Sequence, residues 1–200
     1  MDALSVIEKA VNIVNEYQAA RAEPKEVPPA AGGGQKIWQA PTSGTFKINS
    51  DAAVYGDGTL GFGGIVRDEM GEVMLATCDV YEGGCDTDVA EAMAARHAVK
   101  VAVEAGLRNI VLESDCLKLI THLKKGLLEN SGFSLIVKDI LLFRSSNVSL
   151  AFNHVRREGN RVAHQLAQMS RTFRELRVWI EEVPNEVWTY VLSDMISMNA

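Results

Sequence analysis

Cysteine is scarce in this chain of 200 residues: it occurs three times and never in a CxxC pair. Three isolated thiols argue against a disulfide framework and a zinc finger, and they indicate an intracellular, reducing compartment, either nuclear or cytoplasmic. A long apolar run is also missing, and the N-terminus has no basic segment followed by an apolar one. We therefore expect no transmembrane helix, no secretory signal and no membrane partner.

Basic charge is deficient as well. The chain has 26 acidic and 20 basic residues, which gives a formal net charge of −6. This balance argues against nucleic-acid binding through bulk electrostatics. One stretch departs from it, because arginine occurs repeatedly and glutamate rarely between residues 156 and 177. That stretch is either a solvated helix face or a phosphate-binding surface, and the pattern alone favours neither.

Proline is rare and unevenly placed. Most of the prolines lie between residues 24 and 29, and a triple glycine follows at Gly32-Gly33-Gly34. This composition predicts a linker over residues 22–35. Before it, apolar residues recur at helical spacing, which predicts a helix over residues 1–21 that docks on the main domain or on a partner protein.

Beyond the linker, the hydrophobic period changes from that of strands to that of helices. Short turns join the first three predicted strands, so we expect an antiparallel meander. Helix crossovers then make the later strands parallel to the first. We expect an α/β domain over residues 36–171 and a helical tail over residues 172–200. The expected elements are strands 45–55, 60–68 and 72–82, helix 88–105, strand 109–113, helices 116–125 and 133–144, strand 148–155 and helix 158–171.

Asp51 lies in the middle of the first predicted strand, where aspartate is uncommon. The alternation of the strand places Lys47, Asn49 and Asp51 on one face. A buried carboxylate is costly unless a partner compensates its charge, and a metal ion would do so. A metal site requires further carboxylates at the same point.

Two further carboxylates have positions that suit such a site. Glu91 opens the apolar stripe of the helix 88–105, and Asp115 follows a strand at its carboxyl end, where sites form in α/β sheets. Each also has a purely structural interpretation. Asp88 and Glu91 fit a capping box, which is the favoured interpretation of Glu91 taken alone, and Asp115 fits the N-cap of the next helix.

A glycine-rich segment and two histidines complete the candidates. Residues 56–61 match G-x-G-x-x-G, but β-like residues follow, so we interpret them as a hairpin turn rather than a dinucleotide site. Asn160 and His164 lie one helical turn apart and share a face. His154 and His164 are also compatible with ordinary surface or core histidines.

Together, these ordered motifs resemble the type 1 ribonuclease H domain. The closer similarity is to the plant group found in retrotransposons without long terminal repeats and in host proteins derived from them. The resemblance covers residues 36–171, and the tail to about residue 195 also looks like that plant group. It implies a ribonuclease H-like fold: a five-stranded mixed sheet, with the first three strands antiparallel and helices on both faces. The matching motifs are Trp38-Gln39-Ala40-Pro41, Lys47-Ile48-Asn49-Ser50-Asp51-Ala52-Ala53, Gly61-Phe62-Gly63-Gly64-Ile65-Val66-Arg67-Asp68, Ala90-Glu91-Ala92, Glu113-Ser114-Asp115 and residues 154–164.

The resemblance also implies an activity, namely hydrolysis of the RNA strand of RNA–DNA hybrids by a two-metal mechanism. Asp51, Glu91 and Asp115 would hold two Mg²⁺ ions, which prefer hard oxygen ligands, and Mn²⁺ is a possible substitute. His154 and His164 would take part in catalysis. Contacts with the substrate are expected from Asn49, Ala52, Thr87, Arg156, Arg157, Asn160 and Arg161.

The chain departs from the family pattern beside the expected metal ligands. The family usually has a fourth carboxylate where this chain has His164, and imidazole is a weak ligand for Mg²⁺ and a better one for Mn²⁺. Ala52 stands where glycine is frequent, and its methyl group narrows the approach of a substrate backbone. His154 matches a mobile histidine of the family by its spacing to Asn160.

Other departures concern the substrate contacts. Thr87, Asp88 and Leu117 replace residues that form hydrogen bonds in the family. A leucine cannot donate to a nucleotide, and the carboxylate of Asp88 would repel a phosphate. Arg156 or Arg157 could occupy the place of the mobile histidine instead of His154.

Three functions follow, in order of preference. The first is a metal-dependent endoribonuclease acting on RNA–DNA hybrids. The second is a catalytically weak or inactive nucleic-acid-binding module with the same fold, favoured by His164, Leu117 and Asp88. The third is a protein-interaction domain with residues 1–21 as its handle. The sequence carries no signal for the oligomeric state.

Overall fold

The computed structural model describes residues 36–144 and 147–198 of the chain. The predicted N-terminal helix and linker, residues 1–21 and 22–35, lie outside the described residues. Within the described part, no helix has both the length and the apolar character needed to cross a membrane.

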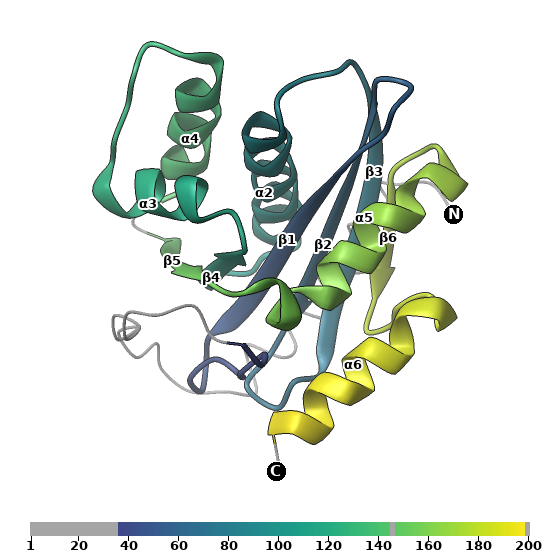
Figure 1. The fold of residues 1–200 in the computed structure, drawn as a ribbon. Coiled ribbons are helices and arrows are strands. Elements are labelled where there is room, and N and C mark those ends of the chain that lie inside the picture. Colours follow the sequence, from purple (N-terminus) through teal and green to yellow (C-terminus); the bar gives the residue numbers. More distant parts are fainter. Residues whose placement is uncertain (1–35, 145–146, 199–200) are drawn as a thin grey trace.

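A mixed sheet forms the centre of the molecule, with the strand order β5-β4-β1-β2-β3-β6 (Figure 1). Strands β1 (Phe46–Val54), β2 (Thr59–Arg67) and β3 (Val73–Glu82) form the predicted antiparallel meander. Strands β4 (Asn109–Ser114) and β5 (Ser149–His154) extend the sheet in parallel with β1. The predicted order of these strands along the chain and their predicted directions are confirmed.

The predicted number of strands is wrong, because the sheet has six strands and not five. The additional strand is β6 (Arg177–Ile180), which pairs with β3 in antiparallel orientation. Its residues belong to the segment predicted as a helical tail. A strand of four residues is too short to show a period of two, so its apolar side chains were indistinguishable from a helix face.

The helices of the described part are α2 (Thr87–Glu104), α3 (Leu117–Lys125), α4 (Gly132–Leu142), α5 (Arg161–Phe173) and α6 (Asn185–Met198). A short 3₁₀ turn, η1 (Arg157–Gly159), precedes α5. Helix α3 ends at Gly126, which has φ 64° and adopts the left-handed conformation that terminates helices. Helix α6 confirms that the tail is partly helical.

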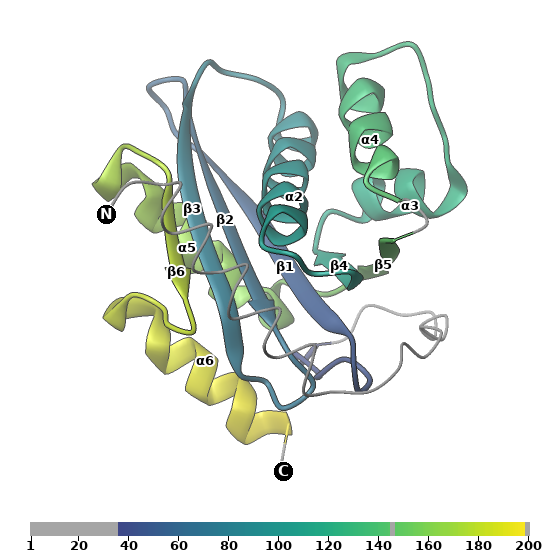
Figure 2. The ribbon, with the colours of Figure 1, turned by 180° about the vertical axis from the view of Figure 1, so that it is seen from behind.

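Helices cover both faces of the sheet, as predicted, and two neighbouring glycines of β2 show how (Figures 1 and 2). A Cβ atom added at Gly63 would overlap the backbone of Ala163 and Ala167 in α5. A Cβ atom added at Gly64 would meet the side chain of Ala98 in α2 at 2.8 Å. Successive residues of a strand point to opposite faces, so α5 and α2 lie on opposite faces.

Each face has its own apolar core. The larger cluster joins α2, α3 and α4 to the sheet through residues such as Ile48, Val99 and Leu112. The smaller cluster joins α5 and α6 to the other face through Ile65, Leu166 and others. Helix α6 is therefore anchored on the same face as α5.

A buried ion pair also ties α6 to the sheet. Arg67 of β2 is fully buried, and its Nη1 donates to Oδ2 of Asp194 in α6 at 2.9 Å. The guanidinium stacks over Trp38 with its carbon 3.7 Å from the ring centroid. Asp194 also lies 3.6 Å from Arg161, at the start of α5. The C-terminal helix thus supplies a counter-charge inside the core.

Candidate metal centre

Asp51, Glu91 and Asp115 come together in the structure. Each residue contributes one carboxylate oxygen, and these three oxygens lie within 4.8 Å of one another. The sheet register explains part of this convergence. Asn49 of β1 is paired with Glu113 of β4 in a parallel ladder, so two residues later Asp51, still within β1, lies beside Asp115, which directly follows the end of β4. Glu91 reaches the same point from the first turns of α2.

Burial makes this cluster electrostatically costly. Asp51 is 4% exposed and Glu91 is 8% exposed. Burial, followed by repulsion from the other two carboxylates, raises the pKa of Glu91 to about 9. Burial and repulsion from Asp115 raise the pKa of Asp51 to about 7. The cluster therefore favours protons or another positive charge over three free carboxylates.

The donor set fits a divalent metal. Oε2 of Glu91 is buried and has no hydrogen-bond partner, while the backbone N–H of Ala52 donates to the same carboxyl group. Buried polar atoms normally have a partner, so an orphaned carboxylate oxygen that faces two further carboxylates indicates a cation. Oxygen donors alone suit a hard cation such as Mg²⁺ or Mn²⁺.

The structural interpretations of these carboxylates are wrong. Asp86, not Asp88, occupies the N-cap position of α2, and no side chain caps this helix. Cys116, not Asp115, occupies the N-cap position of α3, again without a side-chain bond. Asp88 instead accepts a hydrogen bond from Lys118 at 2.7 Å. The ammonium group compensates the charge of Asp88, so the expected repulsion of a phosphate is reduced.

The start of α5 holds two of the carboxylates. Nδ1 of His164 lies 2.8 Å from Oδ2 of Asp51. The amide nitrogen of Asn160 donates to the carbonyl oxygen of Ser50 at 2.9 Å and to Oδ1 of Asp115 at 3.3 Å. Asn160 is buried and His164 is half-buried. The shared face predicted for Asn160 and His164 therefore points at the carboxylate cluster.

The close packing of α5 depends on glycine in β2. Asp51 and Gly63 are paired in the antiparallel register of β1 and β2. Because Gly63 has no side chain, the backbone of α5 passes directly over it and brings His164 to Asp51. The glycines of residues 56–61 form a turn and the start of β2, with Gly58 at φ 84°, so the hairpin interpretation is confirmed.

The remaining expected site residues differ in how deeply they are buried. His154 ends β5, and its Nε2 is 3.3 Å from the carbonyl oxygen of Asp115. Thr87 is exposed at the first position of α2, and Ala52 is half-buried in β1. Arg156 and Arg157 are exposed directly before and within η1. None of these five residues belongs to the carboxylate cluster itself.

Arg161 and Asn49 are engaged elsewhere. The exposed guanidinium of Arg161 donates to Oγ of Ser193 in α6 at 3.1 Å. Asn49 is fully buried, accepts from Nε1 of Trp38 at 2.9 Å and donates to Glu113 at 3.2 Å. The side chain of Asn49 is thus enclosed in the core and already bonded, and its expected contact with substrate stays a prediction.

A buried polar network around Glu113 was not predicted from the sequence. Glu113 is buried, lies 2.7 Å from Nζ of Lys47 and accepts from Asn153 at 3.2 Å. The signal was present in the alternation of Lys47, Asn49 and Asp51 on one strand face. Glu113 continues that polar face on the next strand, and this network supports the strand positions that carry Asp51 and Asp115.

The fold and the carboxylate cluster define an α/β protein of the ribonuclease H-like type with a candidate metal centre. Residues 49–170, well over half of the chain, match the reverse transcriptase-like family, and the chain belongs to that family. A putative ribonuclease H protein of Arabidopsis thaliana is 30% identical over 134 residues, which are 65% of this chain and 21% of the relative. The chain thus spans about a fifth of the length of that relative.

Solved structures of low sequence identity share the fold. The ribonuclease H1 of Halobacterium salinarum superimposes with a TM-score of 0.56 at 20% identity, covering 65% of this chain and 99% of that one. The N-terminal ribonuclease H domain of a Mycobacterium tuberculosis protein gives 0.58 at 16% identity, covering 65% and 95%. The LC11 ribonuclease H1, solved in complex with an RNA/DNA hybrid, gives 0.55 at 20% identity, covering 63% and 96%.

Proposed function

We propose that this protein is a metal-dependent endoribonuclease that hydrolyses the RNA strand of RNA–DNA hybrids. The observation that carries the proposal is the convergence of Asp51, Glu91 and Asp115 around a buried, unpartnered oxygen of Glu91. Membership of the reverse transcriptase-like family and the likeness to a putative ribonuclease H protein support the choice of substrate.

Asp51, Glu91 and Asp115 would hold two Mg²⁺ ions, with Mn²⁺ as a substitute. Bound metal would supply the activation of the attacking water and the stabilisation of the leaving oxygen. Each of the three carboxylates has a defined place before metal arrives. Asn160 holds Asp115, His164 holds Asp51, and the N–H of Ala52 holds Glu91. Such preorganisation reduces the cost of assembling the centre.

His164 occupies the position at which the resemblance leads us to expect a fourth carboxylate. Its Nδ1 is engaged with Asp51, so His164 orients a metal ligand in this geometry rather than adding a free negative charge. Imidazole suits Mn²⁺ better than Mg²⁺, so with His164 in place of a fourth carboxylate we expect Mn²⁺ to bind more tightly than Mg²⁺.

The basic side chains next to the cluster would contact the phosphates of the hybrid. Arg156 and Arg157 are exposed beside η1, adjacent in sequence to the segment that holds Asp115 and Asp51. His154 would assist at the water or the product, and Thr87 would contact the backbone of the substrate. Recognition through phosphates and 2′-hydroxyl groups predicts little preference for sequence.

A cleavage assay tests this proposal. The purified protein, a hybrid with labelled RNA, and Mg²⁺ or Mn²⁺ should give RNA fragments, whereas the same RNA in a duplex with RNA should remain intact. Asp51→Asn should abolish cleavage because it removes a ligand charge. Glu104→Gln, an exposed change at the far end of α2, should not. Cleavage that persists in Asp51→Asn at an undiminished rate would refute the mechanism.

A second candidate is a nucleic-acid-binding module that does not cleave. Two observations favour it: the Asp51 carboxylate is already engaged by His164, and Leu117 is 61% exposed where the resemblance leads us to expect a hydrogen-bonding residue. Calorimetric titration of the protein with the hybrid measures binding, and together with the cleavage assay it separates the two candidates. Hybrid binding with no cleavage at any concentration of either metal would select the binding module, and it would do so whether or not the carboxylates bind Mn²⁺.

A further inference from the structure

Helix α6 and the turn that joins β2 to β3 lie at the end of the sheet away from α3 and α4 (Figure 1). Residues of this turn, of the start of β3 and of α6 line a groove. It has a volume of about 330 Å³. Its apolar lining consists of the exposed Trp188, the half-buried Met195 and the buried Val73, Met74 and Val191, and Glu72 and Glu181 supply its charged side chains. We refer to it as the acidic groove. None of the candidate metal ligands lines it.

The walls of the acidic groove are firmly held. Val187 and Val191 of α6 are buried against the sheet, and Asp194 forms the ion pair with Arg67. On the other wall, Glu181 has φ 57°, and its N–H donates to the carbonyl oxygen of Met74 at 3.1 Å. A glutamate in the left-handed region is uncommon and is kept there by this packing. The groove therefore exists before any ligand arrives.

Apolar surface continues from the groove along α6. Trp188 is 46% exposed, and Ile196, two turns later, is 70% exposed. Leu192 lies between them on the same helix face and is also exposed. Exposed apolar side chains that form a continuous stripe beside a cavity are typical of a protein-interaction surface.

The charged residues that line the groove, Glu72 and Glu181, have one sign. The chain has no lysine or arginine from residue 68 to residue 95, nor from residue 178 to residue 200, and these segments supply both walls. Glu182 and Glu186 add exposed carboxylates at the entry to α6. Such a surface repels nucleic acid and attracts a basic partner.

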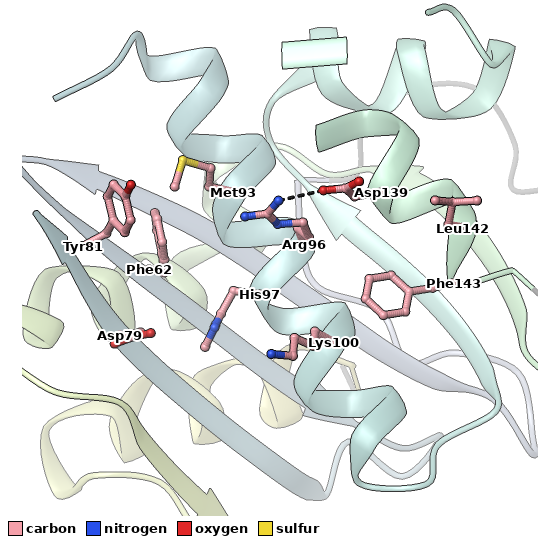
Figure 3. Close-up of a pocket in the computed structure, with 10 residues that line it drawn as sticks. All are labelled: Phe62, Asp79, Tyr81, Met93, Arg96, His97, Lys100, Asp139, Leu142 and Phe143. Atoms are coloured by element: carbon pink, nitrogen blue, oxygen red, sulfur yellow. Dashed lines mark hydrogen bonds and ion pairs between the residues drawn. The ribbon is translucent and has the colours of Figure 1, made fainter. Parts of the chain in front are cut away.

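A larger cavity over α2 shows the contrast (Figure 3). It has a volume of about 530 Å³ and contains Arg96 and Lys100 together with Asp79 and Asp139. Its charges balance, and Arg96 is already paired with Asp139 at 2.7 Å. This cavity does not select one class of ligand by charge, whereas the acidic groove does.

We propose that the acidic groove binds a short segment of a partner protein in which lysine or arginine flanks an aliphatic anchor. The anchor would pack on Trp188 and Met195, and the basic side chains would pair with Glu72 and Glu181. This binding is separate from hybrid cleavage, because the groove shares no residue with the carboxylate cluster. It would recruit a protein while the arginines beside η1 remain free for nucleic acid.

Fluorescence anisotropy with the full chain tests the proposal. The probe is a fluorescein-labelled peptide with a central Leu-Ile-Leu flanked by lysines, and the matched probe carries glutamates in their place. We expect the lysine peptide to bind and the glutamate peptide not to bind. Binding should weaken as the salt concentration rises from about 0.05 M to about 0.5 M, because exposed charges are screened.

Charge reversal locates the binding site. Glu72→Lys with Glu181→Lys should raise the Kd of the lysine peptide by about tenfold or more. Glu82→Lys with Glu129→Lys changes the net charge equally at exposed positions outside the groove and should leave the Kd within about twofold of the wild type. Both pairs are exposed, and thermal unfolding verifies that each variant folds. Equal effects of the two pairs, or no effect of the first, would overturn the proposal.

Two other occupants give different results. If a second copy of the chain fills the groove, sedimentation will show a concentration-dependent dimer that Trp188→Ala abolishes. If nucleic acid fills it, an unlabelled RNA–DNA hybrid will displace the lysine peptide. Either outcome overturns the assignment to a basic partner protein. The assay does not depend on nuclease activity, so it can succeed or fail whether or not the protein cleaves hybrids.

Discussion

Glu91 and Asp51 hold protons more tightly in the folded chain than ordinary carboxyl groups do. Their pKa values are raised to about 9 and about 7, first of all because burial penalises the charged form. In the unfolded chain, both groups release their protons near pH 4 to 5, as carboxyl groups ordinarily do. Above that pH, the folded state retains protons that the unfolded state has lost, so folding becomes less favourable as pH rises.

The metal-free protein should therefore lose thermal stability as pH rises from about 5 to about 9. Glu91→Gln removes the group with the larger shift and should flatten this dependence, whereas Glu104→Gln at an exposed position of α2 should not. Saturating Mn²⁺ should also flatten it, because the metal replaces the protons. Calorimetric melting temperatures across the pH range provide the measurement. A slope that is the same in Glu91→Gln and in the wild type would contradict the assignment.

His164 is the residue at which the metal preference can be changed. His164→Asp replaces an imidazole with an oxygen donor next to Asp51, so we expect Mg²⁺ to bind about tenfold more tightly than in the wild type. Gln168→Asp adds the same charge at an exposed position one turn later on α5, where it is not beside Asp51, and should change the Kd less. Isothermal titration with Mg²⁺ and Mn²⁺ measures both. Equal tightening in the two variants would indicate a general charge effect.

At residue scale, the candidate metal ligands were predictable and their surroundings were not. Asp51 stood out because a charge within a strand requires compensation. Asn49 looked like a substrate contact, but only the structure places it among Trp38, Arg67 and Glu113. A sequence shows which strand face a side chain shares, and it does not show which partners fill the space above that face.

Among the elements, α5 is the one whose position decides the geometry of the centre. It lies directly on Gly63, and its first turns carry Asn160 and His164. Gly63→Ala should push α5 outward, destabilise the fold by about 1–3 kcal/mol and weaken metal binding, because overpacking shifts the backbone. Urea unfolding and metal titration are the measurements.

Gly56→Ala is the matched control for that change. A Cβ atom at Gly56 meets nothing within 4 Å, and we expect an effect on stability below about 1 kcal/mol. Metal affinity should also stay at the wild-type value. If Gly63→Ala destabilises the protein but leaves metal affinity unchanged, α5 does not position the carboxylates.

The elements differ in how well periodicity reveals them. Helix α2 was predictable because 18 residues show several helical turns, and the meander was predictable from its short turns. Strand β6 was not, since its four residues form a strand only by pairing with the edge of β3. Long-range pairing decides the state of short segments, and this information is absent from local sequence.

At the scale of the whole molecule, charge is divided between two regions. Arg156, Arg157 and Arg161 lie at or just before the start of α5, whereas the charged residues of α6 and of the β2–β3 turn are all acidic. The net charge of −6 for the whole chain does not reveal this division. Asp194 joins the two regions, because it lies 2.9 Å from Arg67 in the core and 3.6 Å from Arg161 of α5.

Asp194→Asn should therefore destabilise the whole protein and not only α6. It leaves the fully buried Arg67 without a compensating charge, and breaking a buried pair costs about 3–5 kcal/mol. Asp139→Asn breaks the exposed pair with Arg96 and should cost less than about 1 kcal/mol. Because Arg67 also bonds Asn49, two residues before Asp51 on β1, urea unfolding followed by Trp fluorescence and by loss of bound Mn²⁺ should shift together. A separate early transition of α6, with metal binding retained, would mean that the C-terminal helix is an independent appendage.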